Sequence, residues 1–528
     1  MSERRLGKVA GLVSLATLLS RVMGLVREQV FAAMLGASTL ADAYIAAFRV
    51  PNLLRDLLAE GALSQAFVPA FRGELHKGSL DGSGRAAADR LAARVAGNVI
   101  VVVGLLVGAA MLLAPWLVSA MVGDFDAVPG KVDLTVTLTR VMLPFLLIAS
   151  LTAIAMGMQQ AQEQFAAPAL SPATFNLVAI TIGVGLHASG LPGRGVVIGW
   201  ALGTVVAGLA QLGLQLASLR GSGWRPRLGL DLRLRDPAVR RVALIMAPAI
   251  IAAAAVQVNV FINTAFASED PGAVSWLAYA FRFLQLPIGV FGVAIATVST
   301  TRYADAVARH DDAALARHVT DGLRLVAFLC VPAMVGLLVD ADAVIRLIYQ
   351  HGRFAPRDTS ATALALELYV LGLPAYAAVK VMAPVCYAAD RTRLAVIASV
   401  TAVAGNLAIN ATLHLRYGFR ALAVGTAVAA IANAAILYLG IHRAIVRLPH
   451  RELAGHLLRV GLAAAIMGGA AWGTKLGLDD VAGHAGLGAR ALVALGPVAV
   501  GALVYAVATT ALGIAETRPL LDRLRRRR

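Results

Sequence analysis

Long apolar segments separated by short polar ones recur along the whole chain. A helix needs about 20 apolar residues to cross a bilayer, and fourteen segments are long and apolar enough to do so. Because lipid offers no hydrogen-bond partners, each segment must satisfy its own backbone groups as a helix. We therefore predict an all-α integral membrane protein with about 14 transmembrane helices. Their approximate ranges are 9–36, 40–70, 92–122, 133–160, 168–189, 193–219, 241–268, 272–303, 318–340, 358–389, 393–415, 419–444, 454–475 and 489–513.

The composition supports this prediction and excludes a soluble protein of this size. Of the 528 residues, 59% are hydrophobic and only 15% are charged. In a soluble protein the net charge of +17 would suggest a nucleic-acid partner. Here much of the excess lies in alternate loops, which is the pattern of cytoplasmic loops in membrane proteins. We therefore expect a membrane partner and no nucleic acid.

The charges of the loops predict the orientation of the chain. The N-terminus, the loops at 72–94 and 220–241, and the tail RLRRRR are rich in arginine, whereas GDFDAVPGKVD and ASEDPG are acidic or poor in basic residues. The basic set is expected to be cytoplasmic, and the even number of helices places both termini there. The loop at 340–358 is the exception, because it is basic yet falls outside. No small-residue cleavage site follows a clean apolar core near the N-terminus, so we expect no removed signal peptide.

The chain contains an internal repeat. Arg49 and Arg282, Pro144 and Pro374, Asn176 and Asn406, and Gly199 and Gly425 lie in similar motifs that are 226 to 233 residues apart. A nearly constant offset indicates duplication of a six-helix unit, and two such lobes would flank a central substrate site. The predicted organisation is an N-terminal lobe at 1–220, a C-terminal lobe at 221–445, and two extra helices with a basic tail at 446–528.

Several charged side chains lie inside apolar segments, where each costs about 3 kcal/mol on insertion scales. An intramembrane arginine that lacks a local carboxylate should face water, a partner or an anionic ligand. Guanidinium groups match phosphate oxygens in bidentate geometry, so an arginine-rich cavity suits a diphosphate. The substrate-binding candidates are Arg21, Arg27, Arg49 and Arg282. The gating or supporting candidates are Glu28, Asp42, Arg55, Glu60 and Gln285.

The residues leave other interpretations open. Arg27 with Glu28, and Arg55 with Asp56, are also compatible with simple ion pairs near a membrane surface. Arg49 and Arg55 are also compatible with side chains that reach the cytoplasmic interface. Two further intramembrane cations, Arg140 and Lys380, are interpreted as structural. Motifs for ATP binding, for a serine nucleophile or for zinc are absent from the sequence, so no cofactor and no metal are predicted.

Several motifs resemble those of one known family. They are SRVMGLVRE, ADAYIAAFRVPNLLRDLLAEGALSQAFVPAF, AVSWLAYAFRFLQLPIGVFGVAIAT, IYQHGRFAP and VKVMAPVCYAADRTR. They resemble the MurJ (MviN) family of bacterial lipid II flippases, from about residue 7 to residue 445 and more loosely beyond. This family belongs to the multidrug/oligosaccharidyl-lipid/polysaccharide exporter superfamily.

The resemblance implies a fold of two six-helix lobes around a cationic cavity, plus two extra helices. It implies a transporter, not an enzyme, in the bacterial cytoplasmic membrane. The implied substrate is undecaprenyl-diphosphate linked to a disaccharide-pentapeptide, moved from the inner to the outer leaflet for peptidoglycan synthesis. Cell-wall synthesis and division proteins are candidate partners. The essential cavity arginines of the family fall on Arg21, Arg27 and Arg282.

Two departures from the family pattern stand out. Phe281 and Gln285 replace two carboxylates of the motif YADRLxExP, so Arg282 lacks its usual local counter-charge. Some members bind sodium through an aspartate of the seventh helix, where this chain offers only Gln257, Asn259 and Asn263. A sodium site is therefore not predicted, although Asn406 and Asn410 are candidate ligands on the eleventh helix.

The expected mechanism is alternating access, in which the arginines take the diphosphate while the lipid tail stays in the bilayer. The nearest rival is an exporter of another lipid-linked oligosaccharide or of an organic cation, although a cation exporter would need an acidic cavity. A membrane enzyme acting on a polyprenyl lipid would need a catalytic cluster. A non-transporting scaffold would gain nothing from its intramembrane charges.

Overall fold

The computed structural model describes residues 3–56, 63–77, 84–224, 240, 244, 246, 260–289, 302–482 and 486–517. These residues form helices and turns and no strand, so the all-α prediction is confirmed. The chain divides into two compact units, which we call the N-terminal unit (Met1–Val274) and the C-terminal unit (Ser275–Arg528). The lobe borders expected at 220/221 and 445/446 stay predictions.

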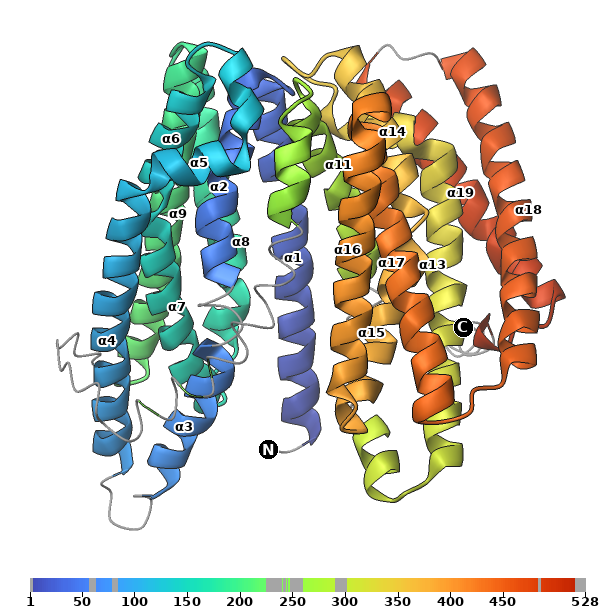
Figure 1. The fold of residues 1–528 in the computed structure, drawn as a ribbon, viewed down its shortest axis with the longest axis horizontal. Coiled ribbons are helices and arrows are strands. Elements are labelled where there is room, and N and C mark those ends of the chain that lie inside the picture. The colour runs from blue at the N-terminus through green and yellow to red at the C-terminus, as the bar shows by residue number, and fades with distance from the viewer. Residues whose placement is uncertain are drawn as a thin grey trace. The chain divides into compact units, whose positions relative to one another are not determined.

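In the N-terminal unit, two segments predicted as single helices are each broken in two (Figure 1). Proline explains two breaks, since it has no N–H to donate and favours the first turn of a helix. The range 133–160 is interrupted at Leu143, before Pro144, and 92–122 is interrupted at Leu113, before Pro115. The elements are α1 (Glu3–Leu35), α2 (Thr39–Arg55), α3 (Ser64–Lys77), α4 (Gly84–Leu112), α5 (Ala114–Met121), η2 (Gly123–Ala127), α6 (Lys131–Met142), α7 (Pro144–Ala161), α8 (Ala166–Ala188) and α9 (Gly193–Gly221).

The described part of the C-terminal unit holds most of α11 (Ala273–Pro287), followed by seven α-helices and one short 3-10 helix. Its first long helix runs well beyond the predicted range 318–340, so part of the expected outer loop at 340–358 is helical. The elements are α13 (Asp312–Tyr349), α14 (Pro356–Val370), α15 (Leu373–Ala388), α16 (Thr392–Tyr417), α17 (Phe419–Ala444), α18 (His450–Ala482), α19 (Leu487–Ala511) and η4 (Ala515–Thr517).

Repeat-related glycines occupy similar places in the two units. In the α8–α9 hairpin, a Cβ at Gly199 would lie 2.6 Å from the Leu186 side chain. In the α16–α17 hairpin, a Cβ at Gly425 would lie 2.7 Å from Asn410 Oδ1. Both distances are shorter than real Cβ atoms tolerate, so each glycine allows the second helix to pack closely on the first. The repeat seen in the sequence therefore marks matching packing positions.

Nine helices among the described residues are long and apolar enough to cross a membrane. A tenth crossing results if α14 and α15, which are bent by 43° at their junction, count as one span. Large apolar side chains such as Leu105, Leu415 and Leu458 are exposed, which suits a surface surrounded by lipid and not by water. The chain is thus a multi-pass membrane protein, and the count of 14 stays a prediction.

Candidate functional site

The first pair of candidate residues lies on α1 of the N-terminal unit. Arg27 Nη2 lies 3.3 Å from Glu28 Oε1, and the two side chains are 20% and 14% exposed. The Arg27 guanidinium also lies 5.5 Å from the centre of the Phe175 ring on α8, within the range of a cation–π interaction. The ion pair left open by the sequence is therefore present. Arg21 is half-buried, six residues earlier on the same helix.

An asparagine that the site prediction omitted fastens this part of α1. Asn176 Nδ2 on α8 donates to the Ser20 carbonyl oxygen at 3.0 Å. The same Nδ2 would lie 3.4 Å from a Cβ at Gly24, so the α1 backbone passes close to the Asn176 side chain between Arg21 and Arg27. Asn176 thus ties the backbone at the start of the arginine segment to α8. The sequence signal was the repeat motif FNLVAI, which contains Asn176.

Asp42 is completely buried near the start of α2 and forms a second polar centre. Its Oδ2 lies 3.2 Å from Lys131 Nζ and accepts a hydrogen bond from the Gly272 backbone N–H at 2.9 Å. Lys131 is buried too, and its ammonium lies 3.5 Å from the centre of the Phe125 ring. Asp42 therefore joins the starts of α2 and α6 to the segment that precedes α11. Sequence reasoning missed Lys131, which had been assigned to a loop.

The remaining candidates of α2 lie toward its end. Arg49 is half-buried. Arg55 contacts Asp56 through both Nη2 at 3.0 Å and Nε at 3.3 Å, so the local ion pair suggested as an alternative is present. Pro51 lies inside α2, which continues to Arg55. Glu60 lies outside the described residues.

Arg282 and Gln285 lie together on α11, but in the C-terminal unit. Both side chains are exposed, whereas Phe283 and Leu284 between them are buried, so the expected i, i+3 relation places them on one face. Phe281, which stands where the family motif has a carboxylate, packs edge-on against Tyr369 of α14 with ring centres 5.5 Å apart. In this chain Phe281 thus contributes to the packing of α11 against α14. The structure does not bring these residues into one unit with Arg21, Arg27 and Arg49.

Two other groups of polar residues were named from the sequence. Asn406 and Asn410 are both fully buried on α16, and among the described residues no group donates to or accepts from the Asn406 amide. Asn263 is half-buried, while Gln257 and Asn259 lie outside the described residues. Arg140 Nε donates to the Met111 carbonyl oxygen in the last turn of α4, at 3.0 Å, which agrees with a structural role. Lys380 is exposed.

The fold has close neighbours among solved transporter structures. A structure described as lipid II flippase MurJ in an inward closed conformation matches 97% of this chain and 99% of its own, with a TM-score of 0.78 and 24% identity. An inward-facing multidrug resistance MATE family transporter of the MOP superfamily matches 83% of this chain and 95% of its own, with a TM-score of 0.63 and 14% identity. The chain thus has the fold of the MOP superfamily transporters.

The sequence comparisons narrow this class. The family model described as lipid II flippase MurJ matches residues 31–478. A probable lipid II flippase MurJ from Vibrio cholerae is 33% identical over 531 aligned residues, which cover 97% of each chain. The chain belongs to the MurJ family of lipid II flippases, as its motifs had indicated. Arg21, Arg27 and Glu28 precede the range matched by the family model but fall within the span aligned with the Vibrio relative.

Proposed function

We propose that this protein moves lipid II, undecaprenyl-diphosphate carrying a disaccharide-pentapeptide, from the inner to the outer leaflet for peptidoglycan synthesis. The observation that carries the proposal is the match of the MurJ model to residues 31–478. The protein would act as a transporter and not as an enzyme, in the cytoplasmic membrane of a bacterium, with both termini in the cytoplasm. Its two lobes would alternate between inward and outward access.

In this proposal Arg21, Arg27, Arg49 and Arg282 bind the diphosphate. Arg27 already lies against a low-polarity ring, Phe175, and its counter-charge Glu28 is a sequence neighbour. A guanidinium in such a place attracts phosphate oxygens more strongly than it would in water, because the surrounding medium screens less. Glu28 would compete with the phosphate and so aid release. Asp42, Arg55, Glu60 and Gln285 would support or gate the movement.

The membrane potential would reset the empty protein. A cationic site without its anionic ligand carries net positive charge, and a potential that is negative inside favours its inward position. The gain is about 2.3 kcal/mol per charge that crosses 100 mV. A flippase of this kind needs no ATP. Cell-wall synthesis and division proteins would use the product at the outer leaflet.

The test uses a bacterium depleted of its own lipid II flippase and supplied with this gene. The measurement is the fraction of lipid II that an externally added lipid II-cleaving enzyme can reach. The wild-type protein should restore access, and Arg27→Ala and Arg282→Ala should each reduce it roughly tenfold or more, since about 1.4 kcal/mol is a factor of ten. Arg140→Ala is the matched control, because it removes an arginine of a membrane segment outside the proposed site.

Membrane levels and folding of each variant are measured in parallel. If the wild-type protein reaches the membrane and access stays low, lipid II is the wrong substrate, and the alternative is another lipid-linked oligosaccharide. If access returns but Arg27→Ala and Arg282→Ala retain it, the family function holds and the proposed diphosphate site is wrong.

A further inference from the structure

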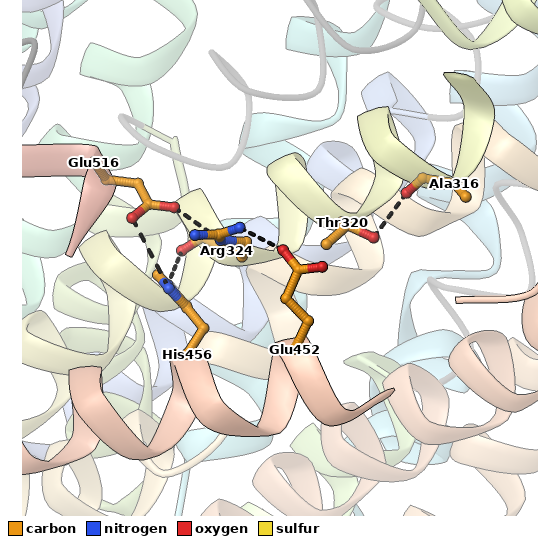
Figure 2. A network of polar contacts seen from close by, with 6 residues as sticks. All are labelled: Ala316, Thr320, Arg324, Glu452, His456 and Glu516. Carbon is orange, nitrogen blue, oxygen red and sulfur yellow. Dashed lines mark hydrogen bonds and ion pairs between the residues drawn. The ribbon is translucent and has the colours of Figure 1, made fainter. Parts of the chain in front are cut away.

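Helices α13 and α18 of the C-terminal unit meet at two polar places, and at the first an arginine forms ion pairs with two carboxylates. Figure 2 shows Arg324 of α13 between two carboxylates, with its Nη1 2.7 Å from Glu452 Oε1 and its Nε 3.1 Å from Glu516 Oε1. His456 Nε2 lies 3.2 Å from the Arg324 carbonyl oxygen, and His456 Nδ1 lies 3.9 Å from Glu516 Oε2. Here the Arg324–Glu452 ion pair joins α13 to α18, and the Arg324–Glu516 ion pair joins α13 to η4.

The second place lies further along both helices and is not paired in this way. Asp340 of α13 is 2% exposed, and among the described residues neither of its carboxyl oxygens has a hydrogen-bond partner. Lys475 of α18 lies beside it, but its Nζ donates to the carbonyl oxygen of Val339 at 3.1 Å. The Lys475 ammonium thus contacts the backbone of the residue that precedes Asp340 and not the Asp340 carboxyl.

Close apolar packing flanks Asp340 on both sides along the two helices. A Cβ at Gly468 would lie 2.6 Å from Val335 Cγ1, so the α18 backbone approaches α13 one to two turns before Asp340. Beyond Asp340, Leu478 of α18 packs against a cluster formed by Ala343, Val493 and Ala494. The carboxyl of Asp340 is therefore enclosed between two apolar contacts of the same pair of helices.

The charged groups around Asp340 come from three helices. Lys475 and Asp479 of α18 and Asp342 of α13 act on Asp340 electrostatically. Glu367 of α14 interacts electrostatically with two of the same residues, Lys475 and Asp342. Asp342 itself is bound by Arg346 one turn away. One cation and two acids thus act on Asp340, so the attraction of Lys475 for a negative charge there is offset in part by repulsion from Asp479 and Asp342.

An isolated ionised carboxylate costs many kcal/mol in such surroundings, and the usual response is to bind a proton. A metal ion fits less well, because the Lys475 ammonium would repel it. Moreover, the described part of the chain holds no group of three or more histidine, cysteine, aspartate or glutamate side chains arranged to bind a metal. The geometry favours a neutral carboxyl beside a cation that is held elsewhere.

We propose that Asp340 is a proton-binding site in the contact between α13 and α18. While the carboxyl holds its proton, Lys475 stays on the Val339 carbonyl. When the proton leaves to water, the O–H bond breaks, the carboxylate becomes an acceptor, and the Lys475 ammonium moves from the carbonyl to Asp340. The proton state of one residue thereby sets how α18 is fastened to α13. This site is independent of the substrate assigned above.

The test measures the infrared carbonyl band of protonated carboxyl groups in the purified full-length protein as a function of pH. At neutral pH we expect a band in the wild type that is absent in Asp340→Asn. Asp342→Asn is the matched control, because it removes a half-exposed acid two residues away that is already paired, and it should keep the band. Thermal unfolding of each variant confirms that it is folded.

A second variant tests the role of the lysine. Lys475→Met removes the cation that favours the ionised carboxyl, so the band should persist to a pH about one unit higher than in the wild type. Three results would overturn the proposal. They are a neutral-pH spectrum that Asp340→Asn leaves unchanged, a band whose pH range Lys475→Met does not move, and loss of the band on adding sodium at constant pH, which would indicate a metal-cation site.

Discussion

Asp42 in the N-terminal unit and Asp340 in the C-terminal unit are both almost completely buried, at 0% and 2% exposure, yet their surroundings differ. Asp42 has an ammonium at 3.2 Å and a backbone N–H at 2.9 Å on one oxygen. Neither oxygen of Asp340 has a partner among the described residues, although a lysine is close by. The two aspartates are thus equally buried, but within the described part of the chain only Asp42 has hydrogen-bond donors close to its carboxylate.

The difference shows why burial alone does not assign a role to an acid. A buried carboxylate with a cation and a backbone donor can stay ionised, because the lost hydration is replaced. Removing either partner then leaves a buried charge without compensation. A buried carboxyl without hydrogen-bond donors is more stable in its neutral form, and it can change its charge when its surroundings change. Asp42 therefore suits a permanent fastening, whereas Asp340 suits a site that gains and loses a proton.

The largest expected effect comes from Asp42→Asn. The substitution keeps the shape of the side chain but leaves the Lys131 ammonium buried without its counter-charge, so the free energy of unfolding should fall by about 3–5 kcal/mol. Unfolding in mixed detergent micelles, followed by circular dichroism, measures it. The double variant Asp42→Asn with Lys131→Met should recover most of the loss. A change below about 1 kcal/mol, which is typical of exposed pairs, would show that the pair is dispensable.

A smaller effect is expected at the Arg324 network. Arg324→Ala leaves Glu516, whose side chain is largely buried, without its main donor, and unfolding should become easier by about 1–3 kcal/mol in the same assay. The loss is smaller than at Asp42 because Glu452 is more than half exposed and can be hydrated instead. Arg324→Lys serves as the control and should lose part of this stability, since one ammonium replaces two separate guanidinium contacts. Equal stability of Arg324→Ala and the wild type would contradict the fastening role.

The smallest effect is expected for Asp340→Asn, the counterpart of the first substitution. Because a neutral amide replaces a carboxyl that we propose to be neutral, the free energy of unfolding near neutral pH should change by less than about 1 kcal/mol. At high pH the variant should be more stable than the wild type, since only the wild type must then bury a negative charge. A loss as large as that of Asp42→Asn would mean that the two aspartates play the same part.

Much of the fold could be predicted from the chain alone. The predicted helix at 419–444 corresponds to α17 (Phe419–Ala444). It was predictable because a long apolar run follows Gly418. The repeat offset pointed to Gly199 and Gly425, which occupy matching packing positions. Local signals of this kind act over a few residues, so they can be recognised without the fold. The split of 92–122 was missed, although Pro115 offered a signal.

The candidate site was predictable only in part. Charges in apolar segments drew attention to Arg27 and Asp42. The ion-pair partner of Arg27 is its neighbour Glu28, whereas that of Asp42 comes from elsewhere in the chain. Lys131 lies 89 residues after Asp42. It was the only lysine of an acidic loop, which was a signal for its own importance but not for the identity of its partner. Asn176 contacts α1 from 156 residues away, and nothing in the local pattern indicates that contact.

The sequence by itself determined that this chain crosses a membrane as helices, that it repeats, and which family it belongs to. These properties depend on hydrophobicity, on the need of the backbone for internal hydrogen bonds, and on local motifs. Only the tertiary structure decided which buried charge is paired. Asp42 and Asp340 are both aspartates at the ends of apolar runs, and their energies depend on whether a distant segment brings a donor within about 3 Å. Such donors come from separate helices, so their positions exist only once the chain has folded.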